Sequence, residues 1–128
     1  NAIKMASWLS ENHKVENVKY PFLESHPQHS LAKNQMKMGG GLVAFELKGG
    51  LNHAQVFLNG LKVHSLTANL GDARSIATHP ASTTHAKLTD NQRLEVGITP
   101  GLIRISVGLE NIEDITNDIL QSLQNLKA

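Results

Sequence analysis

The sequence contains no cysteine and no long apolar run. Without cysteine, neither a disulfide nor a thiolate metal site can form, and the composition fits a reducing compartment, so we expect the cytoplasm. The longest apolar stretches span only a few residues, whereas a membrane-spanning helix needs about 20. The start of the chain also lacks a signal-peptide pattern. We therefore expect no membrane partner.

The chain also lacks a concentration of charge of one sign. Twelve Lys and Arg face eleven Asp and Glu, and the formal net charge is +1. The basic residues are scattered along the sequence instead of forming a stripe, which argues against a nucleic-acid partner. The 128 residues correspond to one domain, which is long enough to bury a core without disulfides or metals.

The sequence lacks the motifs of several common kinds of functional site. His79 and His85 have no further ligands at a spacing that suits zinc, so we expect no metal site. Ser82 and Ser106 lack a G-x-S-x-G elbow, which argues against a hydrolase nucleophile. The glycines at 39–41 match neither a P-loop nor G-x-G-x-x-G, so they are interpreted as backbone devices.

Hydrophobic periodicity predicts an α+β domain with a sheet of three or four mostly antiparallel strands and helices on one face. Residues 69–84 are expected to be mainly an ordered loop, with an extended piece at 74–78. Helices are expected within 1–14, at 26–35, 51–61 and 89–97 and from 112 onward, and strands at 15–20, 42–47, 62–68 and 102–107.

Three helix starts carry capping signals. The segments 25–28 (SHPQ) and 89–92 (TDNQ) have the form of capping boxes, and Asn111 can cap the last helix. Gly97 is expected to end the helix that begins near residue 89. The last helix has an apolar stripe suited to packing on a core: Ile112, Ile115, Ile119, Leu123 and Leu126.

Arg104 is the first candidate functional residue, because it stands in an otherwise apolar strand. An unpaired guanidinium would be costly there, and its planar fork suits two parallel hydrogen bonds to a carboxylate. The competing interpretation is an arginine on a solvated sheet face or in an internal ion pair. Asp72 and Arg74 are expected to form such an ion pair with each other.

Four segments resemble one family, the PLP-dependent enzymes of cysteine and methionine metabolism. They are 79–85 (HPASTTH), 101–110 (GLIRISVGLE), 39–50 (GGGLVAFELKGG) and 69–72 (NLGD). The resemblance covers essentially the whole chain. Within the family, the chain is most similar to the C-terminal domain of the O-acetylhomoserine sulfhydrylases.

This resemblance implies that residues 1–128 are a C-terminal domain, a fragment of a longer enzyme, entered through a helix within 1–14. A larger N-terminal domain would carry the cofactor lysine, and none of the nine lysines here lies in that motif. We therefore expect PLP only in the full-length enzyme, which the resemblance implies to be a homotetramer. The fragment alone is expected to be inactive.

The resemblance also assigns substrate-binding residues. Arg104 would hold the α-carboxylate of the amino-acid substrate, and Thr84 would lie near the substrate in the wall of the active site. Asn69 stands where many lyases of the family have serine and would help to orient the same carboxylate; alternatively, it only makes the turn of an Asn-x-Gly segment. No catalytic, cofactor-binding or metal-binding residue is expected in this chain.

The implied function is that of a transferase, which makes homocysteine and hence methionine precursors from O-acetylhomoserine and sulfide. A cystathionine synthase or lyase of the same family is an alternative. A non-catalytic amino-acid-binding module, which would use Arg104 in the same way, is another, because a fold alone does not fix a function.

Overall fold

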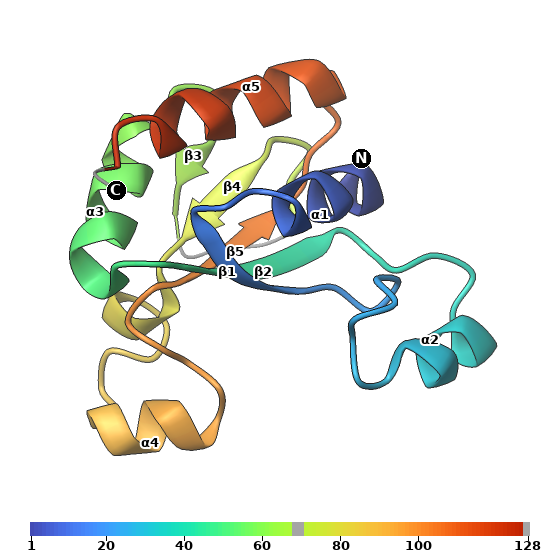
Figure 1. Ribbon diagram of the computed structural model, residues 1–128, viewed down its shortest axis with the longest axis horizontal. Helices are drawn as coiled ribbons and strands as arrows, with labels where there is room; N and C mark the ends of the chain where they lie inside the picture. The colour runs from blue at the N-terminus through green and yellow to red at the C-terminus, as the bar shows by residue number, and fades with distance from the viewer. Residues whose placement is uncertain (68–70, 127–128) are drawn as a thin grey trace.

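The computed structural model describes residues 1–67 and 71–126 as an α+β fold built on one five-stranded sheet (Figure 1). The strands, in chain order, are β1 (Val15–Lys19), β2 (Leu42–Leu47), β3 (Ser65–Leu66), β4 (Ile76–Thr78) and β5 (Leu102–Ser106). Their order across the sheet is β1-β2-β5-β4-β3. All neighbouring pairs are antiparallel except β3 and β4, which are parallel.

The expected α+β class is confirmed, but the expected sheet of three or four strands is wrong in number. The strand expected at 62–68 shrinks to Ser65–Leu66, and the extended piece at 74–78 pairs as β4. Strands of two and three residues are too short to leave a readable alternation, since a period of two needs about four residues to be recognised.

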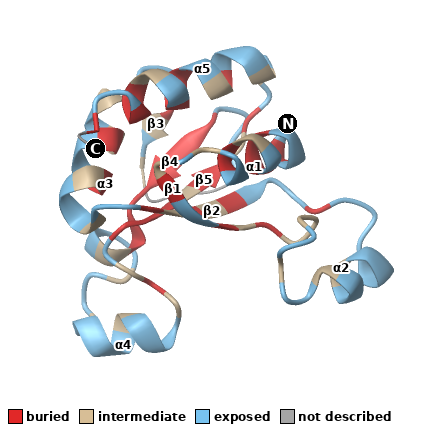
Figure 2. Ribbon diagram, in the orientation of Figure 1, coloured by how far each residue is buried: buried red, intermediate tan, exposed pale blue. Residues whose placement is uncertain are grey.

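Three helices cover one face of the sheet, as expected (Figure 1). Of these, α1 packs on β1 and β2, α3 packs on β2 and β5, and α5 lies against both α1 and α3. The shorter helices α2 and α4 project from the molecule at two separate places, and neither has a buried residue (Figure 2). The helices are α1 (Ala2–Ser10), α2 (His29–Gln35), α3 (Gly50–Gly60), α4 (Asp90–Glu95) and α5 (Ile112–Leu123), and a 3-10 turn, η1, spans Pro80–Ser82.

The core lies between this helical layer and the sheet. Alternate residues of β2 and β5 point toward the helices, and Phe45 meets Phe57 of α3 edge-on, with ring centroids 5.7 Å apart. The apolar stripe of the last helix is confirmed, because Ile115, Ile119 and Leu123 are buried. β5 pairs with a strand on each side and packs against the helical layer on one face. Residues on its other face are therefore well supported.

The expected helix 26–35 begins later than the sequence pattern predicts. It starts at His29, its N-cap Gln28 makes no side-chain cap bond, and the Gln28 N–H donates instead to Nδ1 of His26 at 3.0 Å. The cause is Pro27, because a residue that precedes proline is disfavoured from the helical region. The capping box expected at 25–28 is therefore wrong.

The capping signals of the later helices are confirmed. Thr89 Oγ1 accepts the Gln92 N–H at 3.2 Å, and the Gln92 side chain accepts the Thr89 N–H at 2.9 Å. Asn111 Oδ1 accepts the Glu113 N–H at 2.8 Å. Gly97 has a φ of +80°, the left-handed conformation that follows many helix ends.

Replacing Thr89 with alanine is expected to destabilise α4 by about 1 kcal/mol, because the cap bond to the Gln92 N–H is lost. Hydrogen exchange should show faster exchange of the amides of α4, with those of α5 unchanged. Thr89→Ser keeps the accepting hydroxyl and should retain most of the protection. Equal exchange in the alanine variant and the parent would contradict a stabilising role for the box.

Candidate functional site

The candidate site is the face of the sheet turned away from α1, α3 and α5. Here Lys19, Ala44, Arg104 and Thr78 stand side by side on four neighbouring strands, in the register β1-β2-β5-β4. Because side chains alternate along a strand and those of β5 that flank Arg104 belong to the helix-side core, Arg104 points to the opposite face. The sequence placed Arg104 on a strand correctly.

Small neighbours flank Arg104 on both sides. Ala44 of β2 contributes a single carbon, and Thr78 of β4 contributes a hydroxyl and a methyl group. Arg104 itself is half-buried. A guanidinium with such neighbours on a central strand can present its paired N–H groups to a planar anion, and a carboxylate matches their spacing.

Thr78 is a candidate site residue that sequence reasoning missed. It is buried, and its Oγ1 lies 3.1 Å from Oγ1 of Thr83. Since the Thr83 hydroxyl donates to the His79 carbonyl at 2.7 Å, the Thr78 hydroxyl can donate to Thr83 and keep a lone pair for a further partner. The available signal was the extended segment 74–78, but its pairing with β5 could not be read from the sequence.

Thr84, a predicted site residue, is exposed in the loop that follows η1. Its hydroxyl is 2.7 Å from Nδ1 of the adjacent His85. Thr83, one residue earlier, is the one that reaches Thr78. Asn69, the other predicted residue, lies outside the described residues. The described residue nearest to it on its C-terminal side, Gly71, donates its N–H to Ser106 Oγ at 3.0 Å.

His79 stabilises the loop that follows β4. Its ring is buried, Nε2 lies 2.6 Å from the Pro100 carbonyl oxygen, and Nδ1 lies 2.8 Å from Ser82 Oγ. Because a carbonyl only accepts, Nε2 donates, and in the neutral ring Nδ1 then accepts from the Ser82 hydroxyl. Both ring nitrogens are therefore engaged. Over residues 1–67 and 71–126, no group of three or more His, Cys, Asp or Glu side chains is placed to hold a metal ion.

The ion pair expected between Asp72 and Arg74 is confirmed, with Oδ2 and a guanidinium nitrogen 3.2 Å apart. Hydrogen bonds from the Arg74 backbone N–H and guanidinium hold the pKa of the Asp72 carboxyl below its usual range. Both side chains are exposed, so the pair contributes little to global stability and mainly shapes the turn.

The row of Lys19, Ala44, Arg104 and Thr78 also contains a lysine, the side chain that binds PLP covalently as an imine. Lys19 is the lysine of the row, but its ammonium lies 3.6 Å from the Glu46 carboxylate and donates to the Gly97 carbonyl at 3.2 Å. An imine-forming lysine must release such partners and its proton. Lys19 would therefore have to release both the Glu46 carboxylate and the Gly97 carbonyl before it could form an imine.

Within the described part of the chain, no helix has both the length and the apolar character needed to cross a membrane.

Comparison with known proteins finds close relatives that are much longer. The chain is 48% identical over 126 residues to an L-methionine gamma-lyase of Fusobacterium nucleatum subsp. polymorphum and 47% identical over 128 residues to an O-acetyl-L-homoserine sulfhydrylase of Leptospira meyeri. The matches cover 98% of this chain but only 32% and 29% of those proteins. The chain thus spans about a third of the length of these relatives.

A solved structure supports the same relationship. It is assigned as an O-acetylhomoserine (thiol)-lyase of Campylobacter jejuni subsp. jejuni, contains N′-pyridoxyl-lysine-5′-monophosphate, and superposes with a TM-score of 0.92 at 37% identity. The superposition covers 97% of this chain and 30% of that one. A family profile described as "Cys/Met metabolism PLP-dependent enzyme" matches residues 1–124. The chain belongs to the family of Cys/Met metabolism PLP-dependent enzymes.

Proposed function

We propose that this chain is the C-terminal, substrate-carboxylate-binding domain of a PLP-dependent transferase that makes homocysteine from O-acetylhomoserine and sulfide. The observation that carries the proposal is Arg104 on the central strand, held between the small side chains of Ala44 and Thr78. The proposal includes a homotetramer in the cytoplasm, as the family resemblance and the cysteine-free composition suggest.

In this proposal the chain positions the substrate, and the remaining two thirds of the enzyme hold the cofactor. Arg104 binds the α-carboxylate through two charge-assisted hydrogen bonds, and Asn69 helps to orient it. Fixing one substituent of the α-carbon limits its rotation, so the C–H bond that must break can be held in a productive direction. PLP, when bound by the rest of the enzyme, supplies the electron sink for the bond-breaking steps.

The sulfhydrylase branch is favoured by the segments 69–72 and 79–85 and by the relatives of Leptospira and Campylobacter. A second candidate is a lyase, because relatives named L-methionine gamma-lyase and cystathionine beta-lyase match at 48% and 44% identity. The sequence resemblance gave the cystathionine synthases and lyases as alternatives, and not the methionine lyases. The two activities differ in whether a sulfur nucleophile is added or only released. A non-catalytic amino-acid-binding module is the third candidate.

The experiment is a domain exchange. The matching segment of the Leptospira meyeri sulfhydrylase, 47% identical, is replaced by residues 1–128 of this chain. We expect the chimeric enzyme to retain PLP and to form homocysteine from O-acetyl-L-homoserine and sulfide. Turnover of L-methionine and of cystathionine is measured beside it, and the substrate with the highest kcat/KM identifies the branch.

The 128-residue chain alone, incubated with PLP, is the matched control, and it should give neither turnover nor a stoichiometric aldimine absorbance. A chimeric enzyme that retains PLP but turns over none of the three substrates would contradict the proposed function. A lyase profile would keep the carboxylate-binding role and replace the sulfhydrylase assignment.

A further inference from the structure

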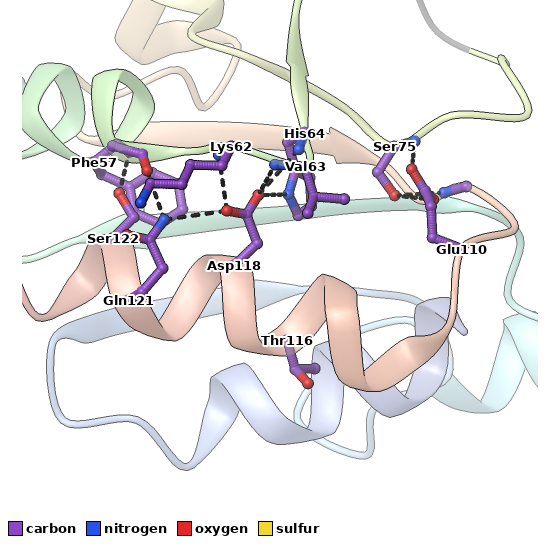
Figure 3. A network of polar contacts seen from close by, with 12 residues as sticks. Phe57, Lys62, Val63, His64, Ser75, Glu110, Thr116, Asp118, Gln121 and Ser122 are labelled. Carbon is purple, nitrogen blue, oxygen red and sulfur yellow. Dashed lines mark hydrogen bonds and ion pairs between the residues drawn. The ribbon is translucent and has the colours of Figure 1, made fainter.

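Glu110 lies just after β5, in the turn that leads into α5, and it binds a residue far away in the sequence (Figure 3). Its Oε2 accepts the Ser75 backbone N–H at 2.8 Å, and its Oε1 accepts the Ser75 hydroxyl at 2.8 Å. Ser75 is fully buried. One carboxylate therefore satisfies both donors of a single residue, which fixes that residue in position and in orientation.

The neighbours of these two residues extend the connection. The Ser75 hydroxyl oxygen accepts the Gly108 N–H at 2.9 Å, and the Ala73 carbonyl accepts the Leu109 N–H at 2.9 Å. A side chain at Gly108 would overlap the Ala73 carbonyl and the Glu110 carboxylate. Residues 71–75 are thus tied closely to residues 106–110, and only glycine fits at the contact.

The charge of Glu110 suits this task. Burial raises the pKa of its carboxyl, but hydrogen bonds from the Ser75 N–H, from its own backbone and from the Ser75 hydroxyl outweigh burial and leave the pKa below its usual range. At neutral pH the carboxylate is ionised, and an ionised carboxylate only accepts hydrogen bonds. Both oxygens can therefore receive a Ser75 donor at the same time.

The segment held in this way leads directly to the candidate site. Ser75 immediately precedes β4, and Thr78 at the end of β4 stands beside Arg104. At the other end of the segment, Gly71 donates its N–H to Ser106 Oγ at 3.0 Å. The Glu110 carboxylate therefore sets where β4 begins relative to β5, and with it which residue of β4 neighbours the arginine.

We infer that Glu110 is a positioning residue, which holds Ser75 and thereby keeps Thr78 in register with Arg104 for carboxylate binding. This inference rests on the proposed role of Arg104. Glu110 does not touch the substrate in this account. It acts through the register of β4. Its contribution to kcat/KM should therefore be present only when Arg104 is present.

A double-mutant cycle in the chimeric enzyme tests this dependence. Glu110→Gln replaces one accepting oxygen with an NH₂ group that faces a Ser75 donor, so we expect roughly a tenfold loss in kcat/KM, mostly through a higher KM. In the Arg104→Ala background the same change should lower kcat/KM by less than about twofold. Ser75→Ala keeps the N–H contact and loses the hydroxyl contacts, and it should show the same pattern with a smaller effect.

The control is Glu113→Gln, an exposed glutamate in the first turn of α5, which should leave kcat/KM unchanged. Equal losses for Glu110→Gln with and without Arg104 would show a merely structural role and overturn the inference, while the proposed function would stand. Unchanged kinetics of Arg104→Ala alone would instead overturn the proposed function. If Glu110→Gln does not fold, Ser75→Ala carries the cycle and decides in the same way.

Discussion

Replacing Arg104 with alanine in the chimeric enzyme is expected to lower kcat/KM for the amino-acid substrate by between about tenfold and more than a hundredfold. Each charge-assisted hydrogen bond to the substrate carboxylate contributes on the order of 1.5 to 3 kcal/mol, and alanine removes both. The loss should be specific for substrates with a free carboxylate. Steady-state kinetics with O-acetyl-L-homoserine and with its carboxyl methyl ester measure this, since the ester should be affected little.

Arg104→Lys should rescue poorly. Lysine keeps the positive charge but lacks the planar fork that forms two parallel hydrogen bonds. The visible spectrum of bound PLP should stay the same in both variants, because the proposal places the cofactor in the other part of the enzyme. A charge-matched control is Arg93→Ala, whose guanidinium donates to backbone carbonyls near α4 and to Asp90. It should alter stability without a selective loss on the free carboxylate.

Arg104 also takes part in an interaction within the chain, so a thermal melt must accompany the kinetics. If the guanidinium serves only that internal contact, Arg104→Ala should lower the melting temperature and leave kcat/KM of the folded enzyme unchanged. That combination would contradict the carboxylate-anchor assignment. A large kinetic loss with a small change in melting temperature would support it.

The sequence predicted those parts of the fold whose signal is local. The strand Leu42–Leu47 and the box from Thr89 to Gln92 appear as expected, because a compact apolar run and a reciprocal cap depend on residues close in the chain. The prediction for the start of α2 was wrong for an equally local reason, since Pro27 opposes helical geometry at His26. The proline, and not the cap pattern, decides where α2 begins.

The parts that could not be predicted depend on pairing between distant residues. The place of Arg104 on a strand was readable, but its neighbours Ala44 and Thr78 follow from the strand order β2-β5-β4. The contact between Glu110 and Ser75 joins residues 35 positions apart and leaves no periodic signal. The predicted role of Thr84 stays a prediction, because an exposed side chain is placed by the loop and by any partner, and not by the core.

Of the substitutions proposed here, Asp118→Ala should lower the free energy of unfolding the most. Asp118 is a buried acid on α5, and its carboxylate accepts the backbone N–H groups of Lys62, Val63 and His64 at 2.8 to 3.0 Å (Figure 3). It also accepts a hydrogen bond from Nδ1 of His64 at 2.8 Å. This single side chain therefore attaches the segment before β3 to the helical layer.

The alanine variant loses these bonds and leaves the buried donors of His64 unsatisfied, so we expect a loss on the order of 3 kcal/mol in the free energy of unfolding. This corresponds to roughly 10 °C in melting temperature for a domain of this size. Asp114→Ala removes an exposed acid from the same helix and serves as the control, with a change below about 0.5 kcal/mol. Equal unfolding midpoints for the two variants would contradict this role.

The effect should also depend on pH in a defined direction. Burial raises the pKa of the Asp118 carboxyl, but hydrogen bonds from the His64 ring and from the N–H groups of residues 62–64 outweigh burial, so its pKa in the folded chain lies below the usual range. Such a group stabilises the fold fully above the pKa of an unfolded aspartate, about 3.9, and the stabilisation fades as the pH falls through the lower folded value. The part of the stability difference between the parent and Asp118→Ala that comes from the carboxylate should therefore be complete at about pH 5 and shrink below about pH 4. Denaturant unfolding at several pH values measures it, and a difference that grows on acidification would mean that the protonated acid, not the carboxylate, holds the segment before β3.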